Sequence, residues 1–452
     1  MLPRFKSNKM YYLSTMALAG PVVISQLGHT LVQTADTMIV GHFAGTISLA
    51  AVSLVHSVFM VVLVIGLGIA YGLTPLIAQE NGRHNLPECA KLLSNSFWLN
   101  IISGILLFLF VYFGSMWAMQ HADQDPQVVE TAKPYLLILS ISIVPLMTFN
   151  TFKQFAEGLG YTKQAMNITI WGNVLNVILA IILVKGMFGI KPMGVSGVGI
   201  ATLVDRILMM IVMAWYVLKS KNFKRYIDHF SVKFIDVVRM KKILKIGAPV
   251  AMQYVFEIGA FAAAALIAGK IGAIEQASHQ TAITLAAMTY MMASGIASAA
   301  TIKVGNAYGT KNLFRLQKFA TVSYHLVLVF MIICAIIFAV FNQYLPYIIT
   351  KDTAVVAMAS QLLIIAGMFQ LFDGTQVVGL GTLRGMGDVN IPTFITFFAY
   401  WVVGIPVAYL LGIVLDIGVQ GIWYGLTLGL LTSSVLLYLR YRYMIKKKLV
   451  RG

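Results

Sequence analysis

The sequence predicts an all-α integral membrane protein, and three observations support this fold class. Hydrophobic residues make up 59% of the 452-residue chain, whereas charged residues make up only 11%. Soluble domains carry about a quarter charged residues. The apolar residues also gather in long runs, such as VFMVVLVIGLGIAYGL at 58–73. A membrane β-barrel would instead alternate apolar and polar residues in strands of roughly ten residues, so we expect helices.

A helix needs about 20 apolar residues to span a bilayer. Twelve stretches of 22 to 29 residues meet this requirement. In chain order they are 12–37, 48–76, 93–118, 132–155, 164–187, 194–218, 243–269, 277–302, 317–341, 354–380, 391–414 and 419–440. They leave little chain for a soluble domain. We therefore predict a lobe of six helices at 1–218, a connector at 219–242, and a second lobe at 243–452.

The net charge of +17 arises from 33 Lys and Arg against 16 Asp and Glu. A nucleic-acid binder could carry such an excess, so its distribution decides its meaning. The basic residues concentrate at the N-terminus, around 83–91, at 219–245, at 303–318 and at 440–451, while 41–47 has none. Basic residues on alternate loops are typical of the cytoplasmic side of membrane proteins. We predict cytoplasmic termini and no nucleic-acid partner.

The two predicted lobes are copies of one another. LAGPVV at 18–23 recurs as IGAPVA at 246–251, and Pro21 and Pro249 are 249 − 21 = 228 residues apart. Gly158 and Gly385 recur at a spacing of 227. Since each copy has an even number of helices, both enter the membrane from the same side and are related by a pseudo-twofold axis along the membrane normal. Transporters built this way bind substrate near the midplane between repeats and work by alternating access.

Three acids lie inside otherwise apolar, membrane-length stretches: Asp36, Glu257 and Asp373. A carboxylate at membrane depth is costly unless it is paired, protonated or facing a wet cavity, so such residues are functional candidates. Carboxylate, amide and hydroxyl oxygens suit hard cations such as sodium, and a carboxylate can equally exchange a proton. The acids predict a cation-handling transporter.

Two further charged pairs receive a structural interpretation. Asp205 and Arg206 are adjacent within a predicted helix, where neighbours do not face one another, so we expect partners on other helices. Lys153 and Glu157 stand four residues apart near a helix end, which predicts a surface ion pair.

The residues resemble the multidrug and toxic compound extrusion (MATE) family over nearly the whole chain. TADTMIVGHFAGTISLAAVSL at 34–54 resembles the family's first-helix block, and KVGNAYGTKN at 303–312 resembles the end of its eighth helix. FDGTQVVGLGTLRGMGDVNIPTFITFFAYWVVGIPVAYLL at 372–411 resembles its tenth and eleventh helices. The joint presence of Glu257 and Asp373 is similar to the NorM branch of that family.

The resemblance implies roles for particular residues. Glu257 and Asp373 match the family's cation site in the second lobe. Asp36 matches the site in the first lobe, with Asn176 and Thr202 as neutral oxygen donors. Ala180 stands where fuller first-lobe sites carry an acid, so we expect Asp36 to bind a cation weakly or to take a proton. Phe369 replaces a tyrosine common in NorM relatives.

The resemblance also implies export of organic cations and drugs, in exchange for sodium ions or protons, across a bacterial inner membrane. We expect the protein to act as a monomer within the lipid bilayer. Aromatic faces attract cations and methionine adapts to varied ligands. The candidates for the substrate cavity are Gln33, Tyr254, Phe256, Phe369, Gln376 and Met288.

Other functional classes fit less well. A flippase or exporter of a lipid-linked or dedicated metabolite could share the two-lobe architecture, but should carry a cationic cavity for pyrophosphate. An enzyme would need a nucleophile and base or a metal constellation at one depth, and we identify no such catalytic set or metal-ligand spacing. The sequence also lacks the GxxxxGK[ST] motif of nucleotide binding. We predict no cofactor besides the coupling ion.

Overall fold

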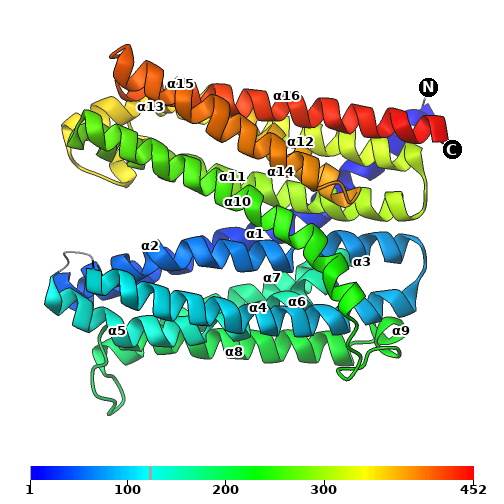
Figure 1. Cartoon of the computed structure of the whole chain (residues 1–452), viewed down its shortest axis with the longest axis horizontal. Helices are drawn as coiled ribbons and strands as arrows, with labels where there is room; N and C mark the ends of the chain where they lie inside the picture. Colours follow the sequence, from blue (N-terminus) through cyan, green and yellow to red (C-terminus); the bar gives the residue numbers. More distant parts are fainter. Residues whose placement is uncertain (1, 122–124, 452) are drawn as a thin grey trace. The chain divides into compact units, whose positions relative to one another are not determined.

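The computed structural model describes residues 2–121 and 125–451, and within them every regular element is a helix (Figure 1). Among these described residues, twelve helical spans are long and apolar enough to cross a membrane. This confirms the predicted fold class and the number of spans. Many side chains on the outer faces are large, apolar and exposed, such as Trp171 at 72% and Leu266 at 69%. Such exposure suits contact with lipid rather than water.

The chain divides into two compact units, which we call the N-unit (Ile24–Ala251) and the C-unit (Met1–Val23 with Met252–Gly452). The N-unit holds the second part of α1 (Leu2–Phe43), then α2 (Gly45–Ala70), α3 (Leu73–Gly82), α4 (Leu86–His121), α5 (Pro126–Ile141), α6 (Ile143–Gly158), α7 (Thr162–Lys185), α8 (Val195–Lys219), α9 (Lys224–Ile227) and the start of α10 (Val237–Ile271). The C-unit holds the rest of α10, then α11 (Ala273–Gly309), α12 (Leu313–Val340), η1 (Leu345–Ile348), α13 (Thr353–Gly385), α14 (Asn390–Phe397), η2 (Phe398–Gly404), α15 (Ile405–Tyr409), η3 (Leu410–Val414) and α16 (Val419–Arg451).

The division between the units falls inside two helices. The first segment of the C-unit ends at Val23, inside α1, and the N-unit ends at Ala251, inside α10. These two residues are 251 − 23 = 228 positions apart, which is the spacing of the sequence repeat. The predicted lobes, 1–218 and 243–452, are instead divided at the connector. The compact units differ from them in two segments: the first half of α1 belongs to the C-unit, and the first part of α10 belongs to the N-unit.

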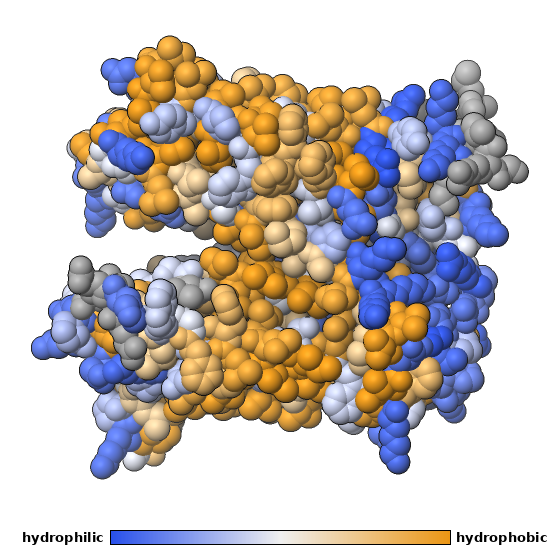
Figure 2. Space-filling view, in the orientation of Figure 1, coloured by the Kyte–Doolittle hydropathy of each residue, from blue (hydrophilic) through white to orange (hydrophobic). Residues whose placement is uncertain are grey.

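Each unit has its own apolar core. In the N-unit the buried cluster includes Val55, Tyr135 and Val198, and in the C-unit it includes Phe369 and Trp423. Figure 2 shows, on each unit taken separately, an apolar outer surface over the helices. Hydrophilic residues lie at both ends of each unit and cover more of the end with α9 in the N-unit and of the end where α16 finishes in the C-unit.

Three spans depart from regular α-helix, and in each the irregularity lies within about two turns before a proline. Tyr71 separates α2 from α3 and precedes Pro75, whereas the break between α5 and α6 precedes Pro145. The π-helix η2 precedes Pro406 in the same way. Proline has no N–H to donate to the carbonyl four residues earlier, and its ring clashes with that carbonyl. These breaks interrupt the predicted spans 48–76, 132–155 and 391–414.

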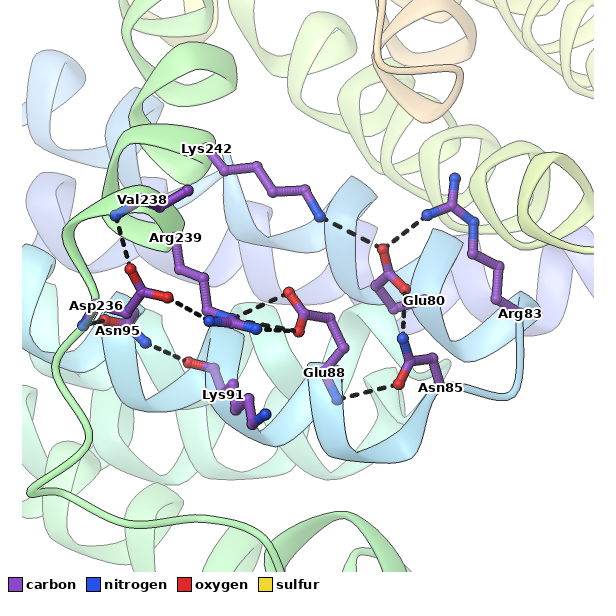
Figure 3. Close-up of polar contacts among 10 residues, drawn as sticks. All are labelled: Glu80, Arg83, Asn85, Glu88, Lys91, Asn95, Asp236, Val238, Arg239 and Lys242. Carbon is purple, nitrogen blue, oxygen red and sulfur yellow. Dashed lines mark hydrogen bonds and ion pairs between the residues drawn. The ribbon is translucent and has the colours of Figure 1, made fainter.

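The start of α10 is clamped to α3 and α4 by ion pairs within the N-unit (Figure 3). Arg239 donates from Nη2 to Oε2 of Glu88 at 2.7 Å and from Nε to both Glu88 oxygens at 3.2 Å. It also pairs with Asp236. Lys242 Nζ lies 3.4 Å from Oε1 of the buried Glu80. The forked guanidinium matches the carboxylate geometry, which is the stronger form of ion pair.

We expect Arg239→Gln to lower the stability of the chain, because Glu88 is only 17% exposed and would lose its bidentate partner. The expected loss is about 1–2 kcal/mol, measured as a lower thermal unfolding midpoint in detergent. The matched control is Lys163→Gln on α7, since Lys163 is exposed and has no ion pair among the described residues. An unchanged midpoint for Arg239→Gln would show that the ion pairs of Arg239 do not stabilise the chain.

The ion pair between Arg239 and Asp236 is expected to weaken in acid. The backbone N–H of Val238 and the guanidinium of Arg239 hold the pKa of Asp236 below its ordinary value of 3.8. Because the folded pKa lies below the unfolded one, the ionised carboxylate contributes to stability above about pH 3.8, and this contribution disappears as the pH falls through the folded pKa. Asp236→Asn should flatten that part of the stability profile.

Candidate cation sites

Glu257 and Asp373 are both buried in the C-unit, at 4% and 3% exposure. Glu257 lies on α10 and Asp373 on α13, so two helices far apart in sequence supply the two acids. Their charges act on one another, and both act on Tyr290 and Tyr400. The structure therefore brings the two predicted acids into one polar cluster inside an apolar unit.

The hydrogen bonds to Glu257 are long. Tyr290 donates to Oε2 at 3.4 Å, and Tyr400 donates to Oε1 at 3.5 Å. Both distances lie beyond the usual range for a hydroxyl donor, 2.5–3.0 Å. Gln376 donates to the Tyr400 hydroxyl at 2.9 Å and so orients it. The oxygens of Glu257 keep much of their capacity to accept another ligand.

Several buried acceptors in this cluster have no partner within the described part of the chain. They are Oδ1 of Asp373 and Oε1 of Gln376, and both amide atoms of Gln370 are also unpartnered. A buried acceptor without a partner costs about 1–3 kcal/mol. Gln370, Asp373 and Gln376 follow one another at intervals of three residues, which places them along one side of α13. A bound cation or proton would satisfy such oxygens.

Tyr400 reaches Glu257 from the π-helix η2. A π-turn inserts an extra residue into the helix and turns the neighbouring side chains, and such turns recur at functional sites. Trp401, the next residue, donates from its indole to the carbonyl of Phe256 at 3.0 Å. The irregular helix is thus fastened to α10 beside the acid.

In the N-unit, Asp36 is 4% exposed on α1, and its Oδ1 has no partner among the described residues. Asn176 on α7 donates to Thr202 on α8 at 3.2 Å, which leaves Oδ1 of Asn176 unpartnered. The described hydrogen bonds join Asn176 to Thr202 but join neither to Asp36. The charged groups that act on Asp36 are Arg206 and Asp205.

Arg206 donates to the hydroxyl of Ser142 at 2.6 Å and lies over the ring of Phe59 at 5.4 Å. This confirms the expected partner on another helix. Oδ1 of Asp205 is buried and unpartnered in the described region. The proximity of Asp205 and Arg206 to Asp36 was missed, because adjacent residues on one helix give no sequence signal of a third helix nearby.

The predicted ion pair of Lys153 and Glu157 is confirmed, but its predicted place at the surface is wrong. Both residues are buried, at 5% and 4% exposure, and Nζ of Lys153 lies 4.0 Å from Oε1 of Glu157. Lys153 also donates to Ser25 on α1 at 3.3 Å. The position near a helix end suggested exposure, but α6 is buried along nearly its whole length.

The substrate candidates lie in different environments. Phe369 is 1% exposed and packs against Trp423 in the C-unit core. Gln376 belongs to the Glu257 cluster, whereas Met288 is 43% exposed. Tyr254 and Phe256 are half-buried on α10, and Gln33 of the N-unit donates to Met60. Their contact with substrate stays a prediction.

Tyr290 and Gln370 are the site residues that sequence reasoning did not name. Tyr290 is 33 residues from Glu257 in the chain, so nothing local signals their contact. Gln370 did carry a signal, since it stands three residues before Asp373 within an apolar run. No group of three or more His, Cys, Asp or Glu that could hold a metal ion is present in the described residues.

The MatE family model matches the chain twice, at residues 21–182 and 249–410. The chain belongs to the MatE family. The two matches begin 249 − 21 = 228 residues apart, which confirms the internal repeat as well as the predicted resemblance.

Curated relatives and solved structures agree with this assignment. The chain is 32% identical, over 96% of both chains, to the multidrug resistance protein MdtK of Yersinia pseudotuberculosis serotype O:1b (strain IP 31758). It resembles the crystal structure of the eukaryotic MATE transporter AtDTX14 with a TM-score of 0.87 and 20% identity, covering 98% of this chain and 99% of that one. A transporter of the MOP superfamily from Pyrococcus furiosus Vc1 (DSM3638) matches with a TM-score of 0.87 and 22% identity, covering 97% and 96%.

Proposed function

We propose that this MatE family member is a secondary active transporter that exports organic cations and drugs in exchange for sodium ions or protons. The observation that carries the proposal is the pair of buried acids, Glu257 and Asp373, whose oxygens lack strong partners. The relatives named multidrug resistance proteins support the substrate class. The protein resides in a bacterial inner membrane, acts as a monomer, and has cytoplasmic termini because the basic loops lie on their side.

The coupling cation binds in the C-unit cluster. Carboxylates of Glu257 and Asp373 supply charge, while the amide oxygen of Gln376 and the hydroxyls of Tyr290 and Tyr400 are neutral donors close by. Hard cations prefer such oxygen ligands. The same carboxylates can hold a proton instead, so sodium and proton compete for one site. No other energy source is required.

The N-unit contributes a second and weaker site at Asp36. Ala180 offers no carboxylate next to Asn176, so the site has fewer charges than the C-unit cluster. Arg206 also acts on Asp36 and opposes the binding of a second positive charge. Asp36 is therefore better suited to exchange a proton than to hold sodium.

Asp36→Asn should lower driven efflux at least ~10-fold at neutral pH, because an amide can neither release a proton nor balance a cation at membrane depth. Asp125→Asn is the matched control: Asp125 is exposed and caps α5 by accepting from the Gln127 N–H, and Asn caps helices equally well. Efflux is measured in cells that express each variant at equal levels. Equal efflux by Asp36→Asn and wild type would remove Asp36 from the mechanism.

The second candidate, a flippase of lipid-linked pyrophosphates, gains one argument from two cations of the N-unit, the buried Lys153 and the half-buried Arg206. Lys153 and Arg206 could attract an anionic headgroup. However, Lys153 lies beside Glu157, and Arg206 donates to Ser142 near two acids. The charges are already balanced by acids, which favours the cation exporter.

The function is tested with purified protein in liposomes. A fluorescent organic cation should move across the membrane with saturation, competed by other organic cations, while a labelled lipid pyrophosphate should not flip faster than in empty liposomes. Flipping without cation transport would reverse the assignment in favour of the flippase.

A further inference from the structure

A groove of 1120 Å³ lies on the C-unit between α12, α13 and α16, and neither Glu257 nor Asp373 lines it. Small-molecule pockets usually measure about 300–1,000 Å³, so the groove suits a longer ligand. It runs along α16 from Leu431 to Lys446, a length of roughly 22 Å at 1.5 Å per residue. One leaflet of the hydrocarbon core is roughly 15 Å thick. The groove therefore matches one leaflet together with its headgroup layer.

The lining changes character along this length. At the Leu431 end the lining includes the apolar Leu328 and Leu371, and the two hydroxyls there, Thr375 and Ser434, hydrogen-bond to one another at 3.0 Å. At the other end stand Arg442 and Lys446, both exposed. The groove thus has an apolar part long enough for acyl chains and a cationic part at its end.

Tyrosines lie between the two parts. Tyr324 packs edge-on against Tyr438 with ring centres 5.9 Å apart, and Tyr438 lies 6.3 Å from Tyr441. Tyrosines favour the depth at which membrane meets water. The Tyr324 hydroxyl is buried without a partner within the described part of the chain. The ring cluster marks the headgroup depth and offers a donor there.

The cationic end lacks a balancing acid. No Asp or Glu is among the described residues that line the groove. Arg440 pairs with Asp388 at 2.7 Å, but within the described region neither Arg442 nor Lys446 has an ion pair. Arg442 donates to the Tyr438 hydroxyl at 3.4 Å, which is a long hydrogen bond. The unbalanced positive charge calls for an anionic occupant.

We propose that this groove binds one anionic phospholipid, whose phosphate lies between Arg442 and Lys446 and whose acyl chains lie along Leu328, Leu371 and Leu431. Basic pockets between membrane helices recognise anionic headgroups. The site is independent of the coupling acids and adds a lipid ligand to the proposed transporter.

Native mass spectrometry of the full chain in non-ionic detergent tests this, with dioleoyl phosphatidylglycerol as the probe. One phosphatidylglycerol should bind tightly and saturably, and dioleoyl phosphatidylcholine should bind at least ~10-fold more weakly. The Arg442→Gln/Lys446→Gln double variant should bind phosphatidylglycerol roughly 30-fold more weakly, since each basic residue near an anionic lipid contributes about a factor of five.

Lys447→Gln is the matched control, because Lys447 is the next residue on α16, is exposed, and does not line the groove. It should retain tight binding. Val435→Trp tests the apolar part with every charge kept: Val435 lines the groove and is 47% exposed, so the larger ring should fill the groove and displace the lipid.

Glycerol phosphate, which has the headgroup charge without chains, should not displace the lipid. Equal binding of phosphatidylcholine, displacement by glycerol phosphate, or unchanged binding in Val435→Trp would each overturn the proposal.

Discussion

Asp373→Asn should abolish cation-driven efflux and leave the protein folded. The substitution keeps the shape of the side chain but removes the charge, and Oδ1 of Asp373 has no hydrogen-bond partner in the described part of the chain that the amide would disrupt. A neutral amide cannot balance sodium or carry a proton. Drug resistance of cells that express the variant should fall to the level of cells without the transporter.

Asp352→Asn is the matched control for this experiment. Asp352 begins the same helix, α13, and accepts hydrogen bonds from the backbone N–H groups of Ala354 and Val355. Asn replaces Asp well as a helix cap. The control therefore removes one negative charge from α13 without touching the cluster, and should confer full resistance. If Asp373→Asn also conferred full resistance at equal expression, Asp373 would not couple transport.

Gly381→Leu should prevent the C-unit from folding. A Cβ at Gly381 would lie 2.4 Å from the carbonyl oxygen of Ala297 on α11, well inside van der Waals contact. Thr301 on α11 also donates to the Gly381 carbonyl at 2.8 Å, so the backbones of α11 and α13 are held close. Because the obstacle is backbone, it cannot move aside as a side chain would. We expect a loss of about 3 kcal/mol or more.

The measurement is the elution profile of a fluorescent fusion of each variant in mild detergent. Gly381→Leu should give aggregated protein in place of a single peak. Gly114→Leu is the control, since Gly114 on α4 has no atom within 4 Å of its added Cβ and is exposed. A single peak of normal height for Gly381→Leu would show that the two helices separate easily.

The twelve spans could be predicted from the sequence because the lipid requirement is strong and simple. A run of about 20 apolar residues has few alternatives to a spanning helix. Asp36, Glu257 and Asp373 could be singled out as candidates by the same physics, since an acid inside such a run is conspicuous. The interruptions before Pro75, Pro145 and Pro406 could not be predicted from the prolines alone, because Pro21, Pro134 and Pro249 lie inside continuous helices.

Contacts between helices could not be predicted. Tyr400 reaches Glu257 across 143 positions in the chain, and Arg206 reaches Ser142 across 64. Nothing in local periodicity specifies which faces meet, because in a membrane the outside of a helix is as apolar as its packed side. The same ambiguity explains why Lys153 and Glu157 were expected at the surface. A polar pair near a helix end gives the same sequence pattern whether it contacts lipid headgroups or a neighbouring helix.

The most direct test of the account separates the two possible driving gradients. Purified protein in liposomes receives a sodium gradient without a pH difference, or a pH difference without sodium, and efflux of a fluorescent organic cation is followed. Wild type should show saturable transport under at least one gradient. Glu257→Gln and Asp373→Asn should show none under that gradient. If neither gradient drives transport by the wild type, or if both variants transport as well as the wild type, the proposal that cations are exchanged at Glu257 and Asp373 is wrong.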